Sequence, residues 1–222
     1  MSNEWLFLIS ALVDIFLVFL VAQRAPDRLF GVIAMNLILI SIFGGKFINI
    51  FGFVTNAGNV FYACVFLATH FLLERTSKEN TLPTIWFGAG AVFFFIVLSQ
   101  LAVYFGATSP TSPLNAALGV VFALSPRIAF ASILSYIFAQ YINIALYSWI
   151  KEHTKDKFLW LRSNGANIVA QLADSAIFFT VAFLDLPGGE LVQAILIGWA
   201  IKTAVVVLGT PFLYLDRHLR RL

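Results

Sequence analysis

The sequence predicts an all-α integral membrane protein, a single bundle of about seven transmembrane helices, with six as the alternative. Of its 222 residues, 60% are hydrophobic and 11% are charged, and the mean hydropathy is +0.91. A soluble domain carries roughly a quarter charged residues. Apolar segments near the length of about 20 residues that a helix needs to cross a bilayer recur along the whole chain. Lys and Arg fall in alternate connectors between these segments.

Seven apolar segments joined by short polar connectors are the expected spans. They lie near residues 4–23, 29–54, 58–74, 82–106, 116–150, 159–184 and 190–215. No connector is long enough to separate two domains, so we expect residues 1–222 to form one polytopic domain. The first segment follows a stretch that contains Glu4 and no Lys or Arg, so we expect it to be retained as a span and not cleaved as a signal peptide.

Two of these segments are irregular, whereas the others each fit one crossing. The second contains Gly44-Gly45, a pair that would kink or break a helix at membrane depth. The fifth is too long for one straight crossing and is interrupted by Ser125-Pro126. Because proline favours the first turn of a helix and disfavours its interior, we expect a short helix near 116–124 and a long one that begins at Pro126.

The basic connectors predict the orientation of the chain. Ten Lys and Arg residues lie in the first, third and fifth connectors and after the last span: Arg24, Arg28, Arg75, Lys78, Lys151, Lys155, Lys157, Arg217, Arg220 and Arg221. The alternate connectors contain no Lys or Arg. Because basic connectors stay in the cytoplasm, seven crossings place the N-terminus outside and the C-terminus in the cytoplasm. Six crossings would require one re-entrant segment.

Several classes of function lack the residues that they need. The net charge is +3, but the basic residues form short scattered clusters, which argues against nucleic-acid binding. The lone Cys64 excludes a disulfide within one chain and a multi-cysteine metal site. The sequence has no Ser-His-Asp set, no phosphate-binding Gly loop and no metal-ligand spacing, so we expect no enzyme, no cofactor and no metal.

Ionisable residues within the expected spans are candidates for function. They are Lys46, Arg127, Arg162, Lys202, Asp14 and Asp174, with His70 one helical turn before Glu74. A charge at the bilayer centre costs at least about 2.5–3.5 kcal/mol, so it normally faces a partner or a wet cavity. The structural alternatives are that Arg162 snorkels, that Arg127 reaches the outer headgroups and that Lys46 or Lys202 pairs with Asp14. For His70 the alternative is a hydrogen bond to a backbone carbonyl.

Polar side chains form a stripe along the sixth span. Asn164, Asn167, Gln171 and Asp174 are spaced by three, four and three residues, which places them on one helix face. The fifth span adds Gln140 and Asn143. Such amides can hold transmembrane helices together, but a stripe that ends in a carboxylate favours a polar cavity. The pattern indicates a secondary carrier or a channel-like permease.

The same residues carry a resemblance to a known family. The matching stretches are Phe66-Leu67-Ala68-Thr69-His70, Pro126-Arg127-Ile128-Ala129 through Ala131-Ser132 to Tyr136 and Gln140, Trp160-Leu161-Arg162 through Gln171 to Asp174-Ser175, and Lys202 followed by Thr210-Pro211 and Tyr214. In this order the sequence resembles the queuosine precursor transporter family (the VUT family). The resemblance implies import of 7-cyano-7-deazaguanine, 7-aminomethyl-7-deazaguanine or a related nucleobase across a prokaryotic inner membrane.

The resemblance also implies a set of residues that bind the base. These candidates are His70, Arg127, Gln140, Asn143, Arg162, Asn164, Asn167, Gln171, Asp174 and Lys202. His70 and Asn143 stand where the family usually has Asp, so two negative charges are missing. We expect His70 to act as a neutral hydrogen-bonding group, because burial near several cations disfavours a further positive charge.

The implied partners are the lipid bilayer and a small purine-like molecule, and a homodimer stays open. Two alternatives to a self-sufficient carrier also stay open. One is the substrate-binding subunit of a multicomponent importer, and the other is a membrane scaffold that transports nothing.

Overall fold

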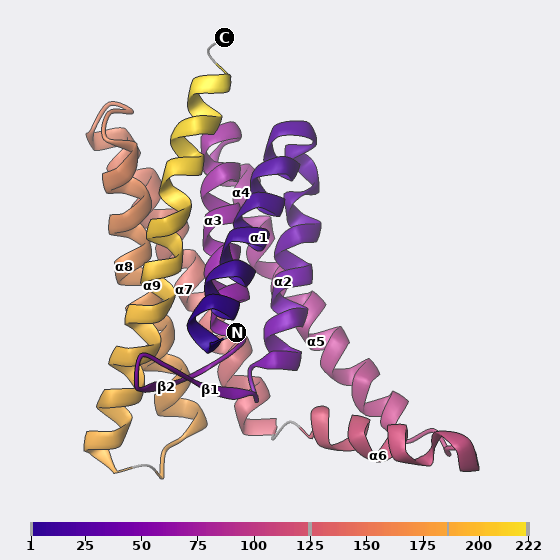
Figure 1. The fold of residues 1–222 in the computed structure, drawn as a ribbon. Helices are drawn as coiled ribbons and strands as arrows, with labels where there is room; N and C mark the ends of the chain where they lie inside the picture. Colours follow the sequence, from indigo (N-terminus) through magenta and orange to yellow (C-terminus); the bar gives the residue numbers. More distant parts are fainter. Residues whose placement is uncertain (1, 124–125, 186, 221–222) are drawn as a thin grey trace.

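Long helices and one small hairpin make up the chain in a computed structural model, which describes residues 2–123, 126–185 and 187–220 (Figure 1). The elements are α1 (Asn3–Arg24), η1 (Pro26–Arg28), α2 (Leu29–Phe43), β1 (Phe47–Ile50), β2 (Phe53–Asn56), α3 (Asn59–Arg75), α4 (Lys78–Thr81), α5 (Pro83–Val103), η2 (Ser109–Thr111), α6 (Ser112–Val121), α7 (Pro126–His153), α8 (Leu159–Ala182) and α9 (Gly188–Leu219).

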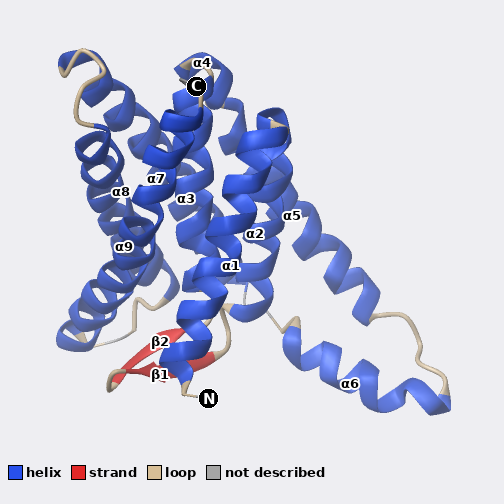
Figure 2. Cartoon of the chain, turned by 45° about the horizontal axis from the view of Figure 1, so that its top comes forward, coloured by secondary structure: helices blue, strands red, loops and turns tan. Residues whose placement is uncertain are grey.

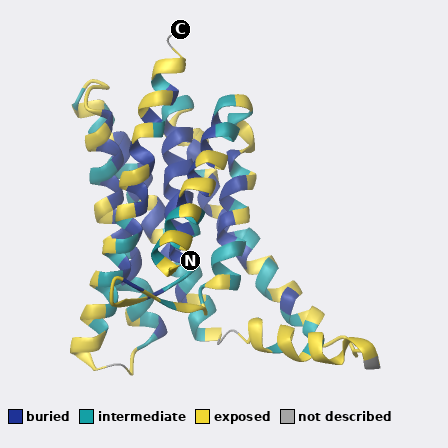
Figure 3. Ribbon diagram, viewed as in Figure 1, coloured by how far each residue is buried: buried dark blue, intermediate teal, exposed yellow. Residues whose placement is uncertain are grey.

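Six helical segments of the described chain are long and apolar enough to cross a membrane. They are Asn3–Arg24, Pro26–Phe43, Lys78–Val103, Pro126–His153, Leu159–Ala182 and Gly188–Leu219. The prediction of an all-α multi-pass membrane protein is confirmed. The third predicted span corresponds to α3, which has 17 residues and lies in the middle of the bundle, where nearly all of its side chains are buried (Figure 3). Its length is at the lower limit of about 17 residues for a spanning helix.

The second predicted span, 29–54, is wrong beyond Phe43. The helix α2 ends there, and the chain turns at Gly44-Gly45 into the antiparallel hairpin of β1 and β2. The hairpin turn is made by Phe51 and Gly52, whose φ angles of 50° and 84° suit a two-residue β-hairpin. Lys46 lies just before this hairpin and is exposed, so the prediction that it is a deep intramembrane cation is wrong.

The fifth predicted span divides as expected. A short helix, α6, extends outward beside the bundle between the far end of α5 and α7, and the long helix α7 begins at Pro126 (Figures 1 and 2). Part of the predicted interruption, Ser125, falls outside the described residues. In α6 no residue is buried, so α6 connects α5 to α7 without crossing the bundle.

The two ends of the bundle differ in charge. At one end, which we call the basic end, side chains of four helices meet: Asp216 of α9 accepts hydrogen bonds from Gln23 and Arg75, and Lys151 lies 3.4 Å from Glu74. At the opposite end, the hairpin end, Asn3 of α1 donates to the carbonyl of Asn49 at 3.0 Å. The gathering of basic residues at one end agrees with the predicted alternation of connectors. The orientation itself stays a prediction.

Candidate substrate cavity and polar column

A cavity of about 340 Å³ lies toward the hairpin end. Residues of α2, α3, α5, α6, α7, α8 and α9 and of the hairpin surround it. Its polar lining consists of Ser41, Asn56, Asn59, Ser132, Ser135, Asp174 and Lys202, and its aromatic lining consists of Phe47, Tyr62, Tyr136, Phe178, Phe179 and Phe183. Small-molecule sites are typically clefts of about 300–1,000 Å³ with apolar walls and a few polar groups, so this cavity has the size and composition of a ligand site.

An ion pair forms part of the cavity wall. The Lys202 Nζ atom lies 2.6 Å from Asp174 Oδ2, and both side chains are 5% exposed. The Tyr62 hydroxyl donates to Asp174 Oδ1 at 2.5 Å, and Lys202 Nζ lies 5.2 Å from the centre of the Tyr62 ring. The expectation that Lys202 pairs with Asp14 is therefore wrong. Since the carboxylate can accept about four hydrogen bonds, it retains capacity for a ligand.

Next to Asp174 on α8 lie polar side chains that have no protein partner. Within the described part of the chain, neither amide atom of Gln171 or Asn167 makes a hydrogen bond, and nor does the Ser175 hydroxyl. All three residues are 0% exposed. A buried polar group without a partner costs about 1–3 kcal/mol, so these groups require water or a ligand. Asn164, by contrast, is half-buried and accepts a hydrogen bond from Thr210 at 2.9 Å.

Closer to the basic end, a chain of hydrogen bonds links α8, α3 and α7. Ser163 Oγ lies 3.0 Å from His70 Nδ1, and His70 Nε2 lies 2.9 Å from Asn143 Oδ1. Asn143 then donates to Gln140 at 3.5 Å, and Gln140 donates to Thr69 at 3.1 Å. The alternative that His70 bonds a backbone carbonyl is wrong. One neutral tautomer of His70, with Nε2 donating and Nδ1 accepting, satisfies the whole chain of bonds.

Arg162 lies inside the bundle at the basic end. It is 0% exposed, and its Nη2 atom lies 2.8 Å from each carboxylate oxygen of Glu74 and 2.8 Å from Asp156 Oδ1. The Tyr147 hydroxyl also donates to Glu74, at 3.0 Å. The alternative that Arg162 snorkels is therefore wrong. The polar column consists of Asp174, Gln171, Asn167 and Ser163, which follow one another along α8 from the cavity to Arg162. The ion pairs around Glu74 lie at its basic end.

Of the ten predicted site residues, Asp174 and Lys202 line the cavity and the other eight do not. Arg127 lies at the start of α7. It does not line the cavity; its Nη1 atom lies 3.1 Å from Asp185, and its Nε–H donates to the carbonyl of Val181 at 2.8 Å. Its side chain is 38% exposed. The alternative that Arg127 reaches the outer headgroups stays a prediction.

Sequence reasoning missed Tyr62 as a partner of Asp174 and Glu74 as the partner of Arg162. Both could have been found from their spacing. Tyr62, Phe66, His70 and Glu74 follow one another at intervals of four residues, which places them on one face of α3. That face points toward the polar stripe of α8, since Tyr62, His70 and Glu74 each contact a residue of α8.

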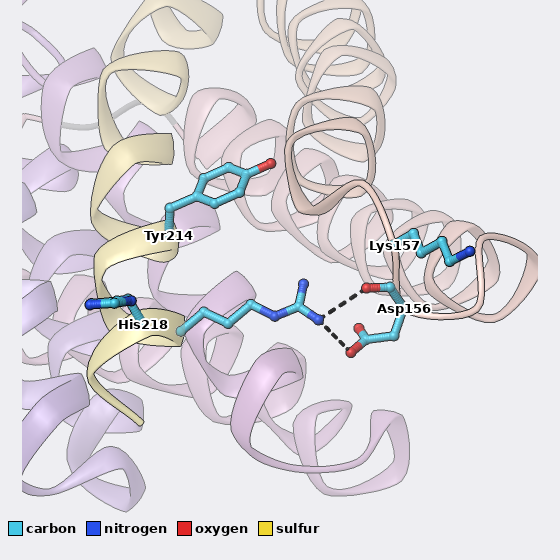
Figure 4. Close-up of a pocket in the computed structure, with 5 residues that line it drawn as sticks. Asp156, Lys157, Tyr214 and His218 are labelled. Atoms are coloured by element: carbon cyan, nitrogen blue, oxygen red, sulfur yellow. Dashed lines mark hydrogen bonds and ion pairs between the residues drawn. The ribbon is translucent and has the colours of Figure 1, made fainter. Parts of the chain in front are cut away.

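A second hollow, of about 350 Å³, lies on the surface of the basic end (Figure 4). Asp156, Lys157, Tyr214, Arg217 and His218 line it. Arg217 donates to the carboxylate and to the carbonyl of Asp156, at 2.8 and 3.1 Å (Figure 4). The hollow is open and its central charges neutralise each other, so the deep cavity beside Asp174 is the better candidate for a substrate site.

Comparison with known proteins identifies the family to which these helices belong. Residues 56–215 match the family described as "Putative vitamin uptake transporter". The chain belongs to the vitamin uptake transporter family. It is also 32% identical, over 171 residues, to the "Probable queuosine precursor transporter" of Bacillus subtilis (strain 168), an alignment that covers 76% of this chain and 74% of the relative. No solved structure matches.

These matches confirm the resemblance that the sequence motifs indicated. As a member of the vitamin uptake transporter family with six long apolar helical segments in its described part, the protein is a multi-pass cell membrane transporter. The matched residues include α8, which carries the polar column, together with α3, α7 and most of α9. Helices α1 and α2 precede the matched region.

Proposed function

We propose that this vitamin uptake transporter imports a flat purine-like base, in the first place 7-cyano-7-deazaguanine or 7-aminomethyl-7-deazaguanine. The observation that carries the proposal is a buried carboxylate, Asp174, in the cavity wall. Two buried amides, Gln171 and Asn167, follow it along α8 behind the lining and have no hydrogen-bond partner among the described residues. The name of the Bacillus subtilis relative, a queuosine precursor transporter, supports the same class of substrate.

The chemistry of a deazaguanine suits this set of groups. Its pairing edge presents N–H donors and one carbonyl acceptor. Asp174 would accept from the ring and exocyclic N–H groups, and Gln171 or Asn167 would supply complementary amide bonds. Lys202 would donate to the carbonyl. The aromatic residues of the cavity wall, such as Tyr136, provide faces on which a flat ring can stack.

The charges near the column favour a neutral base over a cationic one. His70 and Asn143 replace the acidic residues usual in the family, and they are bonded to each other at 2.9 Å. Asp174 already pairs with Lys202. A cationic aminomethyl group would therefore find no unpaired carboxylate next to the cavity among the described residues. We infer a preference for the 7-cyano base.

The direction of transport follows from the predicted orientation. With the basic end in the cytoplasm, the cavity lies toward the outside and the ion pairs of Arg162 and Glu74 lie between it and the cytoplasm. This arrangement would receive substrate from outside the cell. Inward release would then require these pairs to separate.

The proposal is tested by uptake of labelled 7-cyano-7-deazaguanine in cells that cannot synthesise deazaguanines. The wild-type chain should restore uptake. Asp174→Asn should reduce uptake by about tenfold or more, because a neutral amide replaces a buried charged acceptor, which makes the stronger hydrogen bonds. Glu152→Gln, at an exposed position of α7, is the matched control and should transport normally. Normal uptake by a correctly inserted Asp174→Asn chain would remove Asp174 from the site.

The same substrate distinguishes the other two classes of function. Purified chain in proteoliposomes should take up the base by itself. If the chain binds the base but takes it up only after ATPase subunits are added, it is the substrate-binding subunit of a larger importer. If the chain neither binds nor takes up the base, the result would favour a scaffold.

A further inference from the structure

Asp14 differs from the other buried acidic side chains of the described chain. Glu74, Asp174 and Asp216 each have a cation within 3.5 Å: Arg162, Lys202 and Arg220, respectively. Asp14 is 5% exposed and takes part in no ion pair among the described residues. It lies in the middle of α1, which is long and apolar enough to span the membrane. An ionised carboxylate in such a place requires a counter-charge.

The surroundings of Asp14 supply hydrogen-bonding groups and no charge. Asn36 of α2, 0% exposed, donates to Asp14 Oδ1 at 3.2 Å. In the described part of the chain, Asp14 Oδ2 and Asn36 Oδ1 have no hydrogen-bond partner. The thiol of Cys64 on α3 lies beside the carboxylate and is also fully buried. Asp14 Oδ2 and Asn36 Oδ1 are therefore buried acceptors without a hydrogen-bond donor, and no cation lies beside them among the described residues.

The charged groups on the neighbouring elements are exposed or engaged elsewhere. Asp27 and Arg28 of η1, which packs against α1, are exposed. Helix α2 contains no charged residue, and the strand β1 contains none. On α3, Glu74 and Arg75 lie at the basic end, where they pair with Arg162 and Asp216. On α9, Lys202 pairs with Asp174 and Arg217 pairs with Asp156, while Glu190 and His218 are exposed. Among the described residues, Cys64 is thus the titratable group next to Asp14.

We infer that Asp14 is the site that binds the proton driving uptake, an inference that rests on the proposed transport function. One proton adds to Asp14 Oδ2 and gives a neutral carboxylic acid, whose O–H can donate to an acceptor such as Asn36 Oδ1. Release of the same proton on the other side of the membrane regenerates the carboxylate. A proton fits better than Na⁺, because Asp14 and Asn36 offer three side-chain oxygens, too few to surround a metal ion.

The position of the site gives a physical route for coupling to substrate. Asn36 and Cys64 belong to α2 and α3, and the same two helices line the cavity through Leu37 and Tyr62. A shift of either helix on substrate binding would change the surroundings of Asp14. By linkage, a proton on Asp14 would change the affinity for substrate by the same factor as substrate changes the affinity for the proton.

The test uses purified chain in proteoliposomes with labelled 7-cyano-7-deazaguanine. An inward gradient of about one pH unit should sustain about tenfold accumulation by the wild type if one proton accompanies each base. Asp14→Asn should lose this accumulation and retain exchange of internal for external base to within about twofold, because exchange needs no net proton movement. Asp14→Glu should retain accumulation. Asp27→Asn, which removes an exposed carboxylate, is the matched control.

A second variant and a second readout keep the test decisive. Asn36→Leu removes the amide and keeps the carboxylate, so it should shift the pH at which accumulation is half-maximal. The thermal unfolding midpoint of the detergent-solubilised chain should vary with pH more in the wild type than in Asp14→Asn, a readout that needs no substrate. Accumulation by Asp14→Asn equal to the wild type, or accumulation driven by Na⁺ and not by pH, would overturn the inference. Absence of wild-type exchange would instead count against the proposed substrate.

Discussion

The Asp174 carboxylate receives donors of two kinds, the ammonium group of Lys202 at 2.6 Å and the hydroxyl of Tyr62 at 2.5 Å. The three side chains come from α8, α9 and α3, so the pair joins the helices that enclose the cavity. Breaking a buried ion pair by removing one partner typically costs about 3–5 kcal/mol, because the remaining charge is uncompensated. The pair is therefore both part of the candidate site and part of what holds the bundle together.

Lys202 provides a prediction about this pair. Lys202→Ala should lower the thermal unfolding midpoint of the solubilised chain and its folded yield more than Lys202→Arg does, because Arg retains the positive charge beside Asp174. Lys157→Ala, at an exposed position of the basic end, serves as the control and should behave like the wild type. Equal midpoints for the Ala and Arg variants would contradict the structural role of the pair.

His70 provides a prediction about selectivity. His70→Gln should retain much of the transport, because an amide can also hydrogen-bond to Asn143 and Ser163. His70→Asp places a carboxylate near the column and should raise the preference for 7-aminomethyl-7-deazaguanine over the neutral 7-cyano base, since a nearby opposite charge stabilises a cation. Competition uptake with the two bases measures the ratio. An unchanged ratio in His70→Asp would mean that His70 does not influence the variable group of the substrate.

At the residue scale, the sequence predicted most of the polar residues that lie within the bundle, with Lys46 and Arg127 as exceptions, but not which of them pair. The spacing of Asn167, Gln171 and Asp174 on one helix face is a local property, and the structure keeps them on one side of α8. The pairing of Lys202 with Asp174, in place of Asp14, depends on which helices are neighbours. The spacing of residues within a helix does not show which helices are its neighbours.

At the scale of elements, close packing around the cavity depends on Gly88 of α5. A Cβ atom added there would lie 2.7 Å from Leu37 Cδ1 and 2.8 Å from Tyr136 Cζ, and it would also meet the Tyr136 hydroxyl. That hydroxyl donates to the carbonyl of Thr84 at 3.0 Å. Both Leu37 and Tyr136 line the cavity. The glycine thus lets α5 approach α2 and α7 closely enough to form the cavity wall.

A pair of alanine substitutions tests this contact. Gly88→Ala should displace Tyr136, destabilise the chain by about 1–3 kcal/mol and reduce uptake, as overpacking does in other cores. Gly90→Ala, on the same helix, is the matched control, because no atom lies within 4 Å of its added Cβ. Thermal unfolding and uptake should be measured for both. Equal behaviour of the two variants would show that the close contact at Gly88 has no energetic consequence.

The elements were predictable where length and hydropathy decide, and less so where a short apolar run has two possible structures. Six of the expected spans correspond to long apolar helical segments, and α7 begins at Pro126 as expected. The stretch 47–54 is as apolar as part of a membrane-spanning helix, but its β-branched and aromatic residues form a hairpin. Periodicity alone does not distinguish these two cases in a run of this length.

At the scale of the whole molecule, the basic connectors lie at one end of the bundle, and the hairpin and α6 lie at the other (Figure 2). The cavity lies nearer to the hairpin end. The ion pairs of Glu74 and Asp216 join α3, α8 and α9 at the basic end. The structure thus has a cavity toward one end and salt bridges at the other. With the predicted orientation, in which the basic end is cytoplasmic, the cavity lies toward the outer side.

Reporter fusions test the orientation. Fusions placed after Arg28, after Lys78, after Lys157 and at the C-terminus should all report a cytoplasmic location, because these sites follow basic clusters. A fusion near Ser112, at the start of α6, should report an external location. A cytoplasmic signal near Ser112 would contradict the seven-crossing orientation and would reverse the side on which the cavity lies.

The most direct test of the proposed site is a cryo-electron microscopy structure of the purified chain with saturating 7-cyano-7-deazaguanine. The account predicts flat bicyclic density in the cavity, with its pairing edge within hydrogen-bond distance of Asp174 and Gln171 and one face against the aromatic wall. Density in the surface hollow beside Asp156 and Arg217, with none next to Asp174, would contradict it.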